Sequence, residues 1–128
     1  MTTTKTLTAE LIAKRFALDL EAHTHTMIEF SQKLAVDPAY AMKWGDNAVE
    51  AAGAIEVLNI VINCFNGSKE ATPETLLDLL ITEANDRIMH NAMYPSRSTS
   101  PMANLIEVAK TTAWANVRRE AMRLLGRY

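Results

Sequence analysis

The stretch that most restricts what this chain can fold into is residues 46–66, DNAVEAAGAIEVLNIVINCFN, which is apolar over most of its length. It is longer than a single strand, which usually has about 4–8 residues. Glu56, Asn59 and Asn63 interrupt it, and this argues against a membrane span. The run therefore predicts a helix with neighbours on nearly every side, at the centre of an all-α fold.

The chain as a whole has the composition of one globular helical domain. Its 128 residues favour a single domain over residues 1–128, of which 1–6 are Thr-rich and expected to be frayed. Four Gly and four Pro are few, which favours helix. The net charge of −2 disfavours DNA as a partner. The one cysteine, Cys64, excludes an intramolecular disulfide and, with no signal-like start, indicates the cytoplasm.

Caps and apolar periodicity predict a compact bundle of four main helices plus one short helix. Three helix starts share one pattern, a capping residue followed by proline: Asp37-Pro38, Thr72-Pro73 and Ser100-Pro101. Gly45 and Gly126 are expected helix stops. The predicted main helices cover residues 8–35, 46–66, 73–93 and 102–125; the short helix covers 38–44, and 94–101 form a loop.

Acidic and histidine residues occur in two groups that could bind a metal. His23 and His25 are two apart, so they cannot share one ion from a straight helix. Glu83, Asp86 and His90 share a face, and Glu83-x-x-Asp86 resembles part of the magnesium pattern of all-α nucleoside triphosphate pyrophosphatases. Those enzymes carry a carboxylate cluster on an earlier helix, which this chain lacks. We predict no metal and no cofactor, and a magnesium-dependent enzyme of that kind stays an alternative.

A polar stripe runs along the central helix, formed by Glu56, Asn59, Asn63 and Asn66 at spacings of three and four. Buried amides need partners, because an unsatisfied one costs about 1–3 kcal/mol. The stripe is compatible with a solvent-facing side, a subunit interface or the lining of a ligand pocket.

Two groups of residues near the C-terminus have the chemistry of an anion site. Arg119, Arg123 and Arg127 recur every four residues at the end of the last helix, where they complement the helix dipole and match phosphate geometry. Hydroxyl and guanidinium groups also precede the same helix, in the loop residues Ser96, Arg97, Ser98 and Thr99. An anion can bind there because a helix N-terminus presents free backbone N–H groups.

Within this region Pro95-Ser96-Arg97, a helix with Leu105 and Glu107, and Trp114-Ala115-Asn116 resemble the C-terminal helical hairpin of phage anti-defence sponge proteins. Proteins of that family form oligomers that sequester cyclic nucleotide signals of bacterial immunity. The resemblance covers residues 95–116, and the spacing between the two motifs is longer here. It implies that Ser96 and Arg97 contact phosphate, and that Trp114 and Asn116 serve packing or assembly.

We therefore expect a non-enzymatic, homo-oligomeric protein that sequesters an anionic small molecule such as a nucleotide. The residues predicted to contact phosphate are Ser96, Arg97, Ser98, Thr99, Arg119 and Arg123. The residues predicted to stack on a base are Tyr94 and Trp114. The alternative partner is a protein, and the chain would then be an inhibitor or a structural helical oligomer. Its contact surface would be apolar and aromatic, formed by Tyr40, Met42, Trp44, Met89, Met93 and Tyr94.

Overall fold

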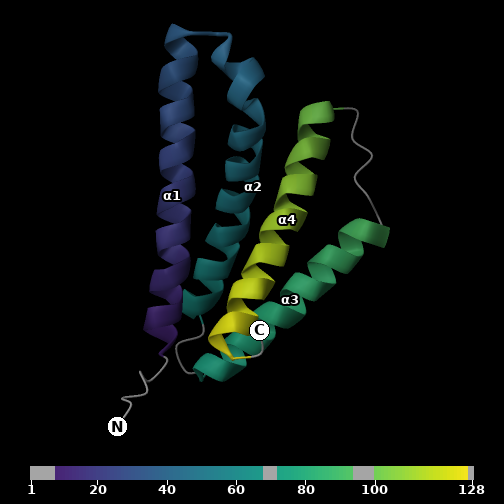
Figure 1. Cartoon of the computed structure of the whole chain (residues 1–128). Coiled ribbons are helices and arrows are strands. Elements are labelled where there is room, and N and C mark those ends of the chain that lie inside the picture. The colour runs from purple at the N-terminus through teal and green to yellow at the C-terminus, as the bar shows by residue number, and fades with distance from the viewer. Residues whose placement is uncertain (1–7, 68–71, 94–99, 127–128) are drawn as a thin grey trace.

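A computed structural model describes residues 8–67, 72–93 and 100–126 of the chain. These residues form four α-helices and no strand: α1 (Ala9–Val36), α2 (Tyr40–Gly67), α3 (Pro73–Met93) and α4 (Pro101–Leu124) (Figure 1). The prediction of an all-α bundle is confirmed.

Side-chain caps set the starts of three helices. Thr8 Oγ1 accepts from the Leu11 amide at 3.1 Å at the start of α1. Thr72 Oγ1 accepts from the Thr75 amide at 3.2 Å at the start of α3. Ser100 Oγ accepts from the Ala103 amide at 3.3 Å at the start of α4. The predicted starts at Thr72-Pro73 and Ser100-Pro101 are therefore confirmed, and α4 is followed by Gly126 with φ +74°, in the left-handed region that favours glycine.

The prediction of a separate short helix over residues 38–44 is wrong. α2 runs without a break from Tyr40 through Gly45 to Gly67, and the turn before it is short: Asp37 Oδ1 accepts from the Ala39 amide at 3.1 Å. A helical glycine costs about 1 kcal/mol relative to alanine. Tyr40 and Trp44 bury part of their rings in this first turn and a half of α2, which offsets the cost of continuing the helix through Gly45.

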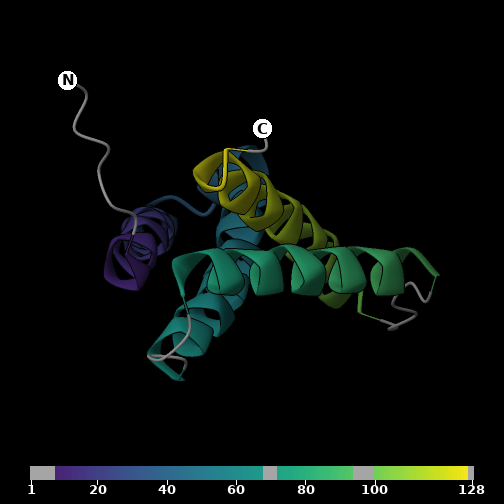
Figure 2. The ribbon, with the colours of Figure 1, turned by 90° about the horizontal axis from the view of Figure 1, so that it is seen from below.

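The helices pack in the spatial order α1, α2, α4, α3. α1 and α2 form an antiparallel hairpin, α4 packs on the other side of α2, and α3 packs on α4 (Figure 1). The view from below in Figure 2 shows α3 lying across the outside of this arrangement. α2 and α4 are therefore the two inner helices, and α1 and α3 the outer ones.

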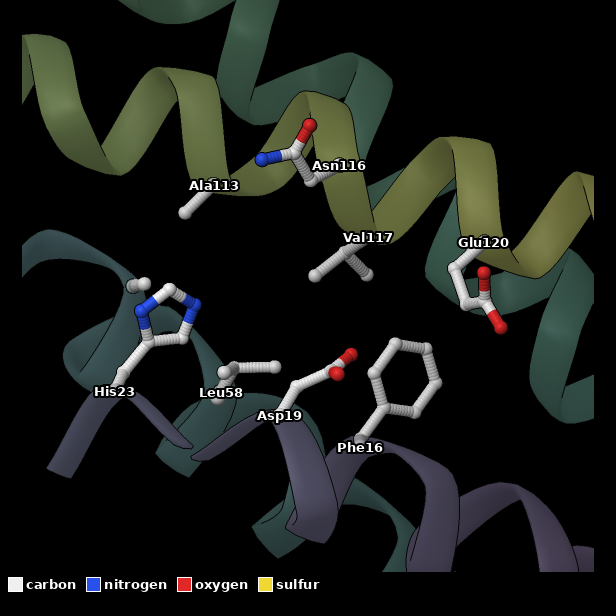
Figure 3. A pocket seen from close by; sticks show the side chains of 9 residues that line it. Phe16, Asp19, His23, Leu58, Ala113, Asn116, Val117 and Glu120 are labelled. Atoms are coloured by element: carbon white, nitrogen blue, oxygen red, sulfur yellow. The ribbon is translucent and has the colours of Figure 1, made fainter. Parts of the chain in front are cut away.

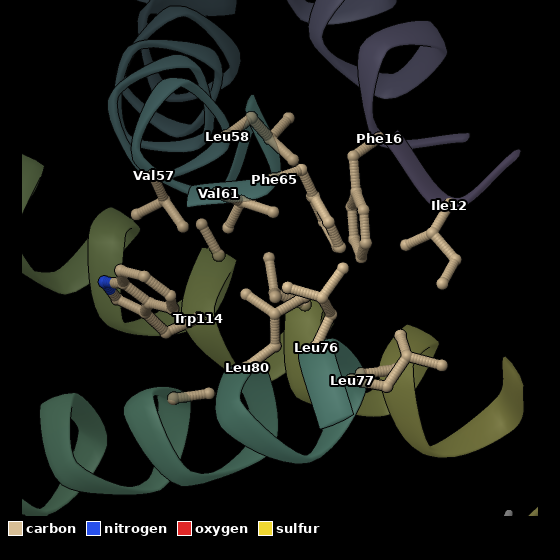
Figure 4. Close-up of a cluster of buried hydrophobic side chains, with 14 of the residues drawn as sticks. Ile12, Phe16, Val57, Leu58, Val61, Phe65, Leu76, Leu77, Leu80 and Trp114 are labelled. Atoms are coloured by element: carbon tan, nitrogen blue, oxygen red, sulfur yellow. The ribbon is translucent and has the colours of Figure 1, made fainter. Parts of the chain in front are cut away.

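The hydrophobic core occupies only one end of this assembly, where one half of every helix meets (Figure 4). It takes the N-terminal halves of α1 and α3 and the C-terminal halves of α2 and α4. Its largest fully buried side chains are Trp114, Phe16, Ile12, Leu77, Val57 and Val61. The C-terminal half of α1 and the N-terminal half of α2 lie beyond this core and have mainly each other to pack against.

α2 is long and apolar enough, by length and composition, to cross a membrane. In this fold 44% of its apolar window is buried, and Ala51, Val57, Leu58 and Val61 are among the buried residues.

Candidate functional site

Among the predicted ligand-binding residues, the structure describes Trp114, Arg119 and Arg123. Tyr94, Ser96, Arg97, Ser98 and Thr99 lie outside the described residues. Ser100 caps the first turn of α4, whereas Arg119 and Arg123 lie near its last turn. At 1.5 Å per residue, Ser100 and Arg119 are about 28 Å apart along the helix axis. One small ligand cannot touch both ends of α4 within a single chain.

Trp114 is part of the core and is almost fully buried. The guanidinium carbon of Arg87 lies 5.5 Å from its ring centroid, within the range of a cation–π contact. The side chain therefore packs α4 against α2 and α3, and its ring has no open face for a base.

Arg123 takes part in an ion-pair network that ties α4 to α1. Arg123 Nε lies 3.1 Å from Glu120 Oε2, and Arg15 Nε of α1 lies 3.1 Å from Glu120 Oε1. The hydrogen bond from Arg123 is the main cause that lowers the pKa of Glu120, and the charges of both arginines add to it. Arg119 is exposed on the same side of α4.

The acidic groups do not form a metal cage. Glu83 Oε1 accepts from Arg87 Nε at 2.7 Å, so this carboxylate is engaged in an ion pair. Among the residues that the structure describes, no three His, Cys, Asp or Glu side chains are placed to hold one ion. The magnesium pattern of the pyrophosphatases needs a second cluster of carboxylates facing Glu83 and Asp86, and the described helices do not supply one.

The polar stripe of α2 faces outward. Glu56, Asn59, Asn63 and Asn66 are all exposed, and Glu56 lies 3.7 Å from Lys110 of α4. Exposure within one chain fits two of the three interpretations of the stripe, a solvent-facing side and a subunit interface.

A small cleft separates α1 from α4 (Figure 3). Asp19 and His23 extend from α1, and Asn116 and Glu120 from α4, above an apolar floor that includes Phe16. Its volume is about 60 Å³. That space holds a few waters, and ligand pockets usually have about 300–1,000 Å³.

A pocket of ligand size lies at the tip of the α1–α2 hairpin, and we call it the tip pocket. Its volume is about 330 Å³. The lining combines aromatic, charged and amide side chains from both helices: Thr26, Glu29, Phe30, Lys33, Tyr40, Trp44, Asn47 and Ala48. The turn at Asp37–Ala39 folds α2 back on α1, and so brings Phe30 beside Tyr40.

Three aromatic rings form a row along the tip pocket. The ring centroids of Phe30 and Tyr40 are 5.6 Å apart, and those of Tyr40 and Trp44 are 6.2 Å apart. Both spacings fall in the range of favourable aromatic pairs. Trp44 keeps 40% of its surface exposed, whereas Phe30 and Tyr40 are half-buried.

Two lysines flank this aromatic row. Lys33 Nζ lies 5.4 Å from the Tyr40 centroid, and Lys43 Nζ lies 5.5 Å from the Trp44 centroid. Lys33 also pairs with Glu29 at 3.0 Å, and that hydrogen bond, more than the charges, lowers the pKa of Glu29 and raises the pKa of Lys33. Lys43 is not one of the lining residues; it lies against the Trp44 ring and has no acidic partner in the described part of the chain.

No family model, no curated protein and no solved structure matches the chain. The chemistry of the site must therefore be argued from its own geometry.

The tip pocket was not predicted from the sequence. Tyr40 and Trp44 were expected on a protein-contact surface and on a separate short helix. The sequence does contain one indication of the pocket, namely aromatic and lysine residues on both sides of the turn at Val36-Asp37-Pro38. They are Phe30 and Lys33 before the turn, and Tyr40, Lys43 and Trp44 after it. A tight turn between two antiparallel helices brings such flanking positions together.

Proposed function

We propose that this chain is a non-enzymatic binding protein whose tip pocket sequesters a planar aromatic ligand that carries a negative charge, in the chemical class of nucleotides. The observation that carries the proposal is the row of Phe30, Tyr40 and Trp44 beside a 330 Å³ pocket, with a lysine against two of the rings. Cyclic mono- and dinucleotides fall within this class.

The aromatic row supplies the stacking half of such a site. A base laid against Trp44 or Tyr40 gains about 1–3 kcal/mol, whatever its sequence identity, because every base has a π face. The partial exposure of Trp44 leaves ring surface for this contact.

Polar groups supply the other half of the site. The ammonium groups of Lys33 and Lys43 lie where they can meet a phosphate attached to a stacked base. The Asn47 amide can donate to and accept from a base edge. Thr26 Oγ1 donates to the Ala22 carbonyl at 3.1 Å, so its lone pairs stay available to accept from a ligand.

The Glu29–Lys33 hydrogen bond lowers the pKa of Glu29 and raises the pKa of Lys33, so both groups are held in their charged forms beside the pocket. The cytoplasm is the compartment that we propose, since the composition and the lone Cys64 favour it.

Isothermal titration calorimetry on the full chain tests this proposal. The probes are nucleoside monophosphates and cyclic dinucleotides, with free nucleosides and inorganic phosphate as half-ligands. Trp44→Leu should weaken binding of the best nucleotide roughly 5- to 150-fold, the equivalent of about 1–3 kcal/mol of stacking. Lys43→Gln should weaken the nucleotide but leave its nucleoside unchanged.

Met42→Ala is the matched control, because Met42 is two residues from Trp44, is 94% exposed and does not line the pocket. Far-UV circular dichroism shows whether each variant keeps its helices. Absence of binding by every planar anionic probe would refute the proposal. Equal losses in Met42→Ala and Trp44→Leu would also refute it.

A further inference from the structure

The outward face of α3 carries a heptad pattern that no described element covers. Its six residues, which we call the α3 seam, are spaced four, three, four, three and four: Thr75, Leu79, Thr82, Asp86, Met89 and Met93. All six are exposed, and Leu79, Met89 and Met93 keep 58%, 61% and 66% of their surface. The opposite face of α3 is the one that enters the core, through Leu76, Leu77, Leu80 and Ala84.

The order of residues in the seam is self-complementary when two copies run antiparallel. We propose that a second copy of this chain binds the α3 seam in that orientation, across a two-fold axis at the level of Ala84. Residues whose numbers add to 168 then face each other. Leu79 meets Met89 of the partner subunit, and Thr75 places its methyl group against Met93 of the partner subunit. Each position meets the complementary heptad position, as knobs-into-holes packing requires.

The middle of the seam also favours antiparallel pairing. Thr82 faces Asp86 of the partner subunit, and a threonine hydroxyl can donate to a carboxylate. In a parallel pair, each Asp86 would face the partner's Asp86, and like charges opposed in this way destabilise a helix pair. A shift by one heptad removes the Leu79–Met89 contact. The polar centre therefore sets direction and register, while the two apolar ends of the seam provide the attraction.

Next to the seam lies an apolar groove between α2 and α3, with a volume of about 380 Å³. Its floor includes Trp114 and Phe65, its rim includes Cys64, and it shares Leu79 with the seam. The apolar surface of the seam therefore continues into a hollow. Methionine fills irregular hollows well because its side chain is unbranched and flexible, so the partner's Met89, placed against Leu79, has a recess to enter.

The contact is short for an interface. α3 has 21 residues and is about 31 Å long, and a standard interface buries about 800 Å² per partner with 20–30 residues a side. The dimer should therefore be weak and depend on protein concentration. The seam is on α3 and the tip pocket is on α1 and α2, so the dimer does not rest on the proposed ligand.

Sedimentation equilibrium of the full chain over a wide concentration range tests the dimer. The wild type should show a reversible monomer–dimer equilibrium. Leu79→Glu should raise the dissociation constant at least about tenfold, because it buries a charge without a partner. Leu18→Glu on the outer face of α1 is the matched control, since Leu18 is 53% exposed, and it should leave the constant unchanged. A chain that is monomeric at every concentration, or equal effects of both substitutions, would overturn the proposal.

Cysteine cross-linking tests the orientation in a Cys64→Ser background. Leu79→Cys together with Met89→Cys should form an interchain disulfide on oxidation. Leu79→Cys alone should not, because the two copies of residue 79 lie ten positions apart along the antiparallel pair, about 15 Å, and a disulfide needs Cα atoms within about 7 Å. Cross-linking of the single variant, or no cross-linking of the double variant, would overturn the antiparallel arrangement.

Discussion

Gly53 stands at a close approach of α2 to α4, so adding one methyl group there tests the packing directly. A Cβ at position 53 would lie 2.7 Å from the Ala109 Cβ and 2.9 Å from the Ala109 carbonyl carbon and the Lys110 nitrogen. Carbon atoms in contact normally lie about 3.5–4.0 Å apart. Two of the three neighbours are backbone atoms, so no change of rotamer relieves the clash, and the two helices must separate by about 1 Å.

The expected cost of Gly53→Ala follows from two opposed terms. Overpacking a core contact costs about 1–3 kcal/mol, and a backbone clash belongs at the upper end of that range. Replacing a helical glycine by alanine returns about 1 kcal/mol. The net loss should be about 2 kcal/mol, or a fall of roughly 8 °C in Tm for a domain of this size.

Gly45→Ala is the control, because it makes the same change in the same helix. A Cβ at position 45 meets nothing within 4 Å, so only the helix-propensity gain of about 0.5–1 kcal/mol remains, and Tm should rise by about 3 °C. Urea titration followed by circular dichroism at 222 nm measures both variants. Ala109→Gly should recover part of the loss in Gly53→Ala, since it removes the nearest of the three atoms. Equal stabilisation by both glycine substitutions would refute the close approach of α2 and α4.

Two further substitutions probe the surface of α4 and the loop before it. Glu120→Gln should lower Tm at neutral pH by less than about 5 °C. The pKa of Glu120 is lowered in the folded chain. Its contribution to the free energy of unfolding is therefore present above the unfolded pKa of about 4.3 and is lost as the pH falls through the folded pKa. The Tm values of both proteins should converge in acid, and a constant difference across pH would contradict the ion-pair assignment. Arg97→Ala tests the predicted loop contact in the calorimetric titration of nucleotides, where a weaker affinity with unchanged Tm would support the loop, and an unchanged affinity would remove it.

The sequence was sufficient to predict the helices wherever local chemistry decides their ends. Thr72 and Ser100, each followed by proline, define starts through short-range hydrogen bonds that the structure contains. Gly45 misled the prediction, because α2 continues through it where Tyr40 packs against Phe30 of α1 and against Trp44. Tertiary contacts of this kind cannot be predicted from the local sequence pattern.

The site was harder to predict than the helices. Its parts are ordinary residues separated by a turn, and only their placement in space makes a pocket of them. The predicted arginine group is also real as a sequence pattern, yet Arg123 is engaged with Glu120 and Arg15 in a contact between helices. The pattern indicates positive charge on α4. It does not reveal that Glu120 of the same helix accepts from Arg123, or that Arg15 of α1 donates to the same carboxylate.

The position of the core at one end of the fold has a consequence for how the chain opens. Residues 54–65 of α2 supply Ala54, Val57, Leu58, Val61 and Phe65 to the core cluster, whereas residues 40–50 of the same helix supply none. We therefore expect the backbone amides of this one helix to fall into two cooperative units, one that exchanges with solvent on global unfolding and one that opens locally at lower free energy. The tip pocket lies in the second unit, so a ligand held there should slow local exchange by joining the C-terminal part of α1 to the N-terminal part of α2.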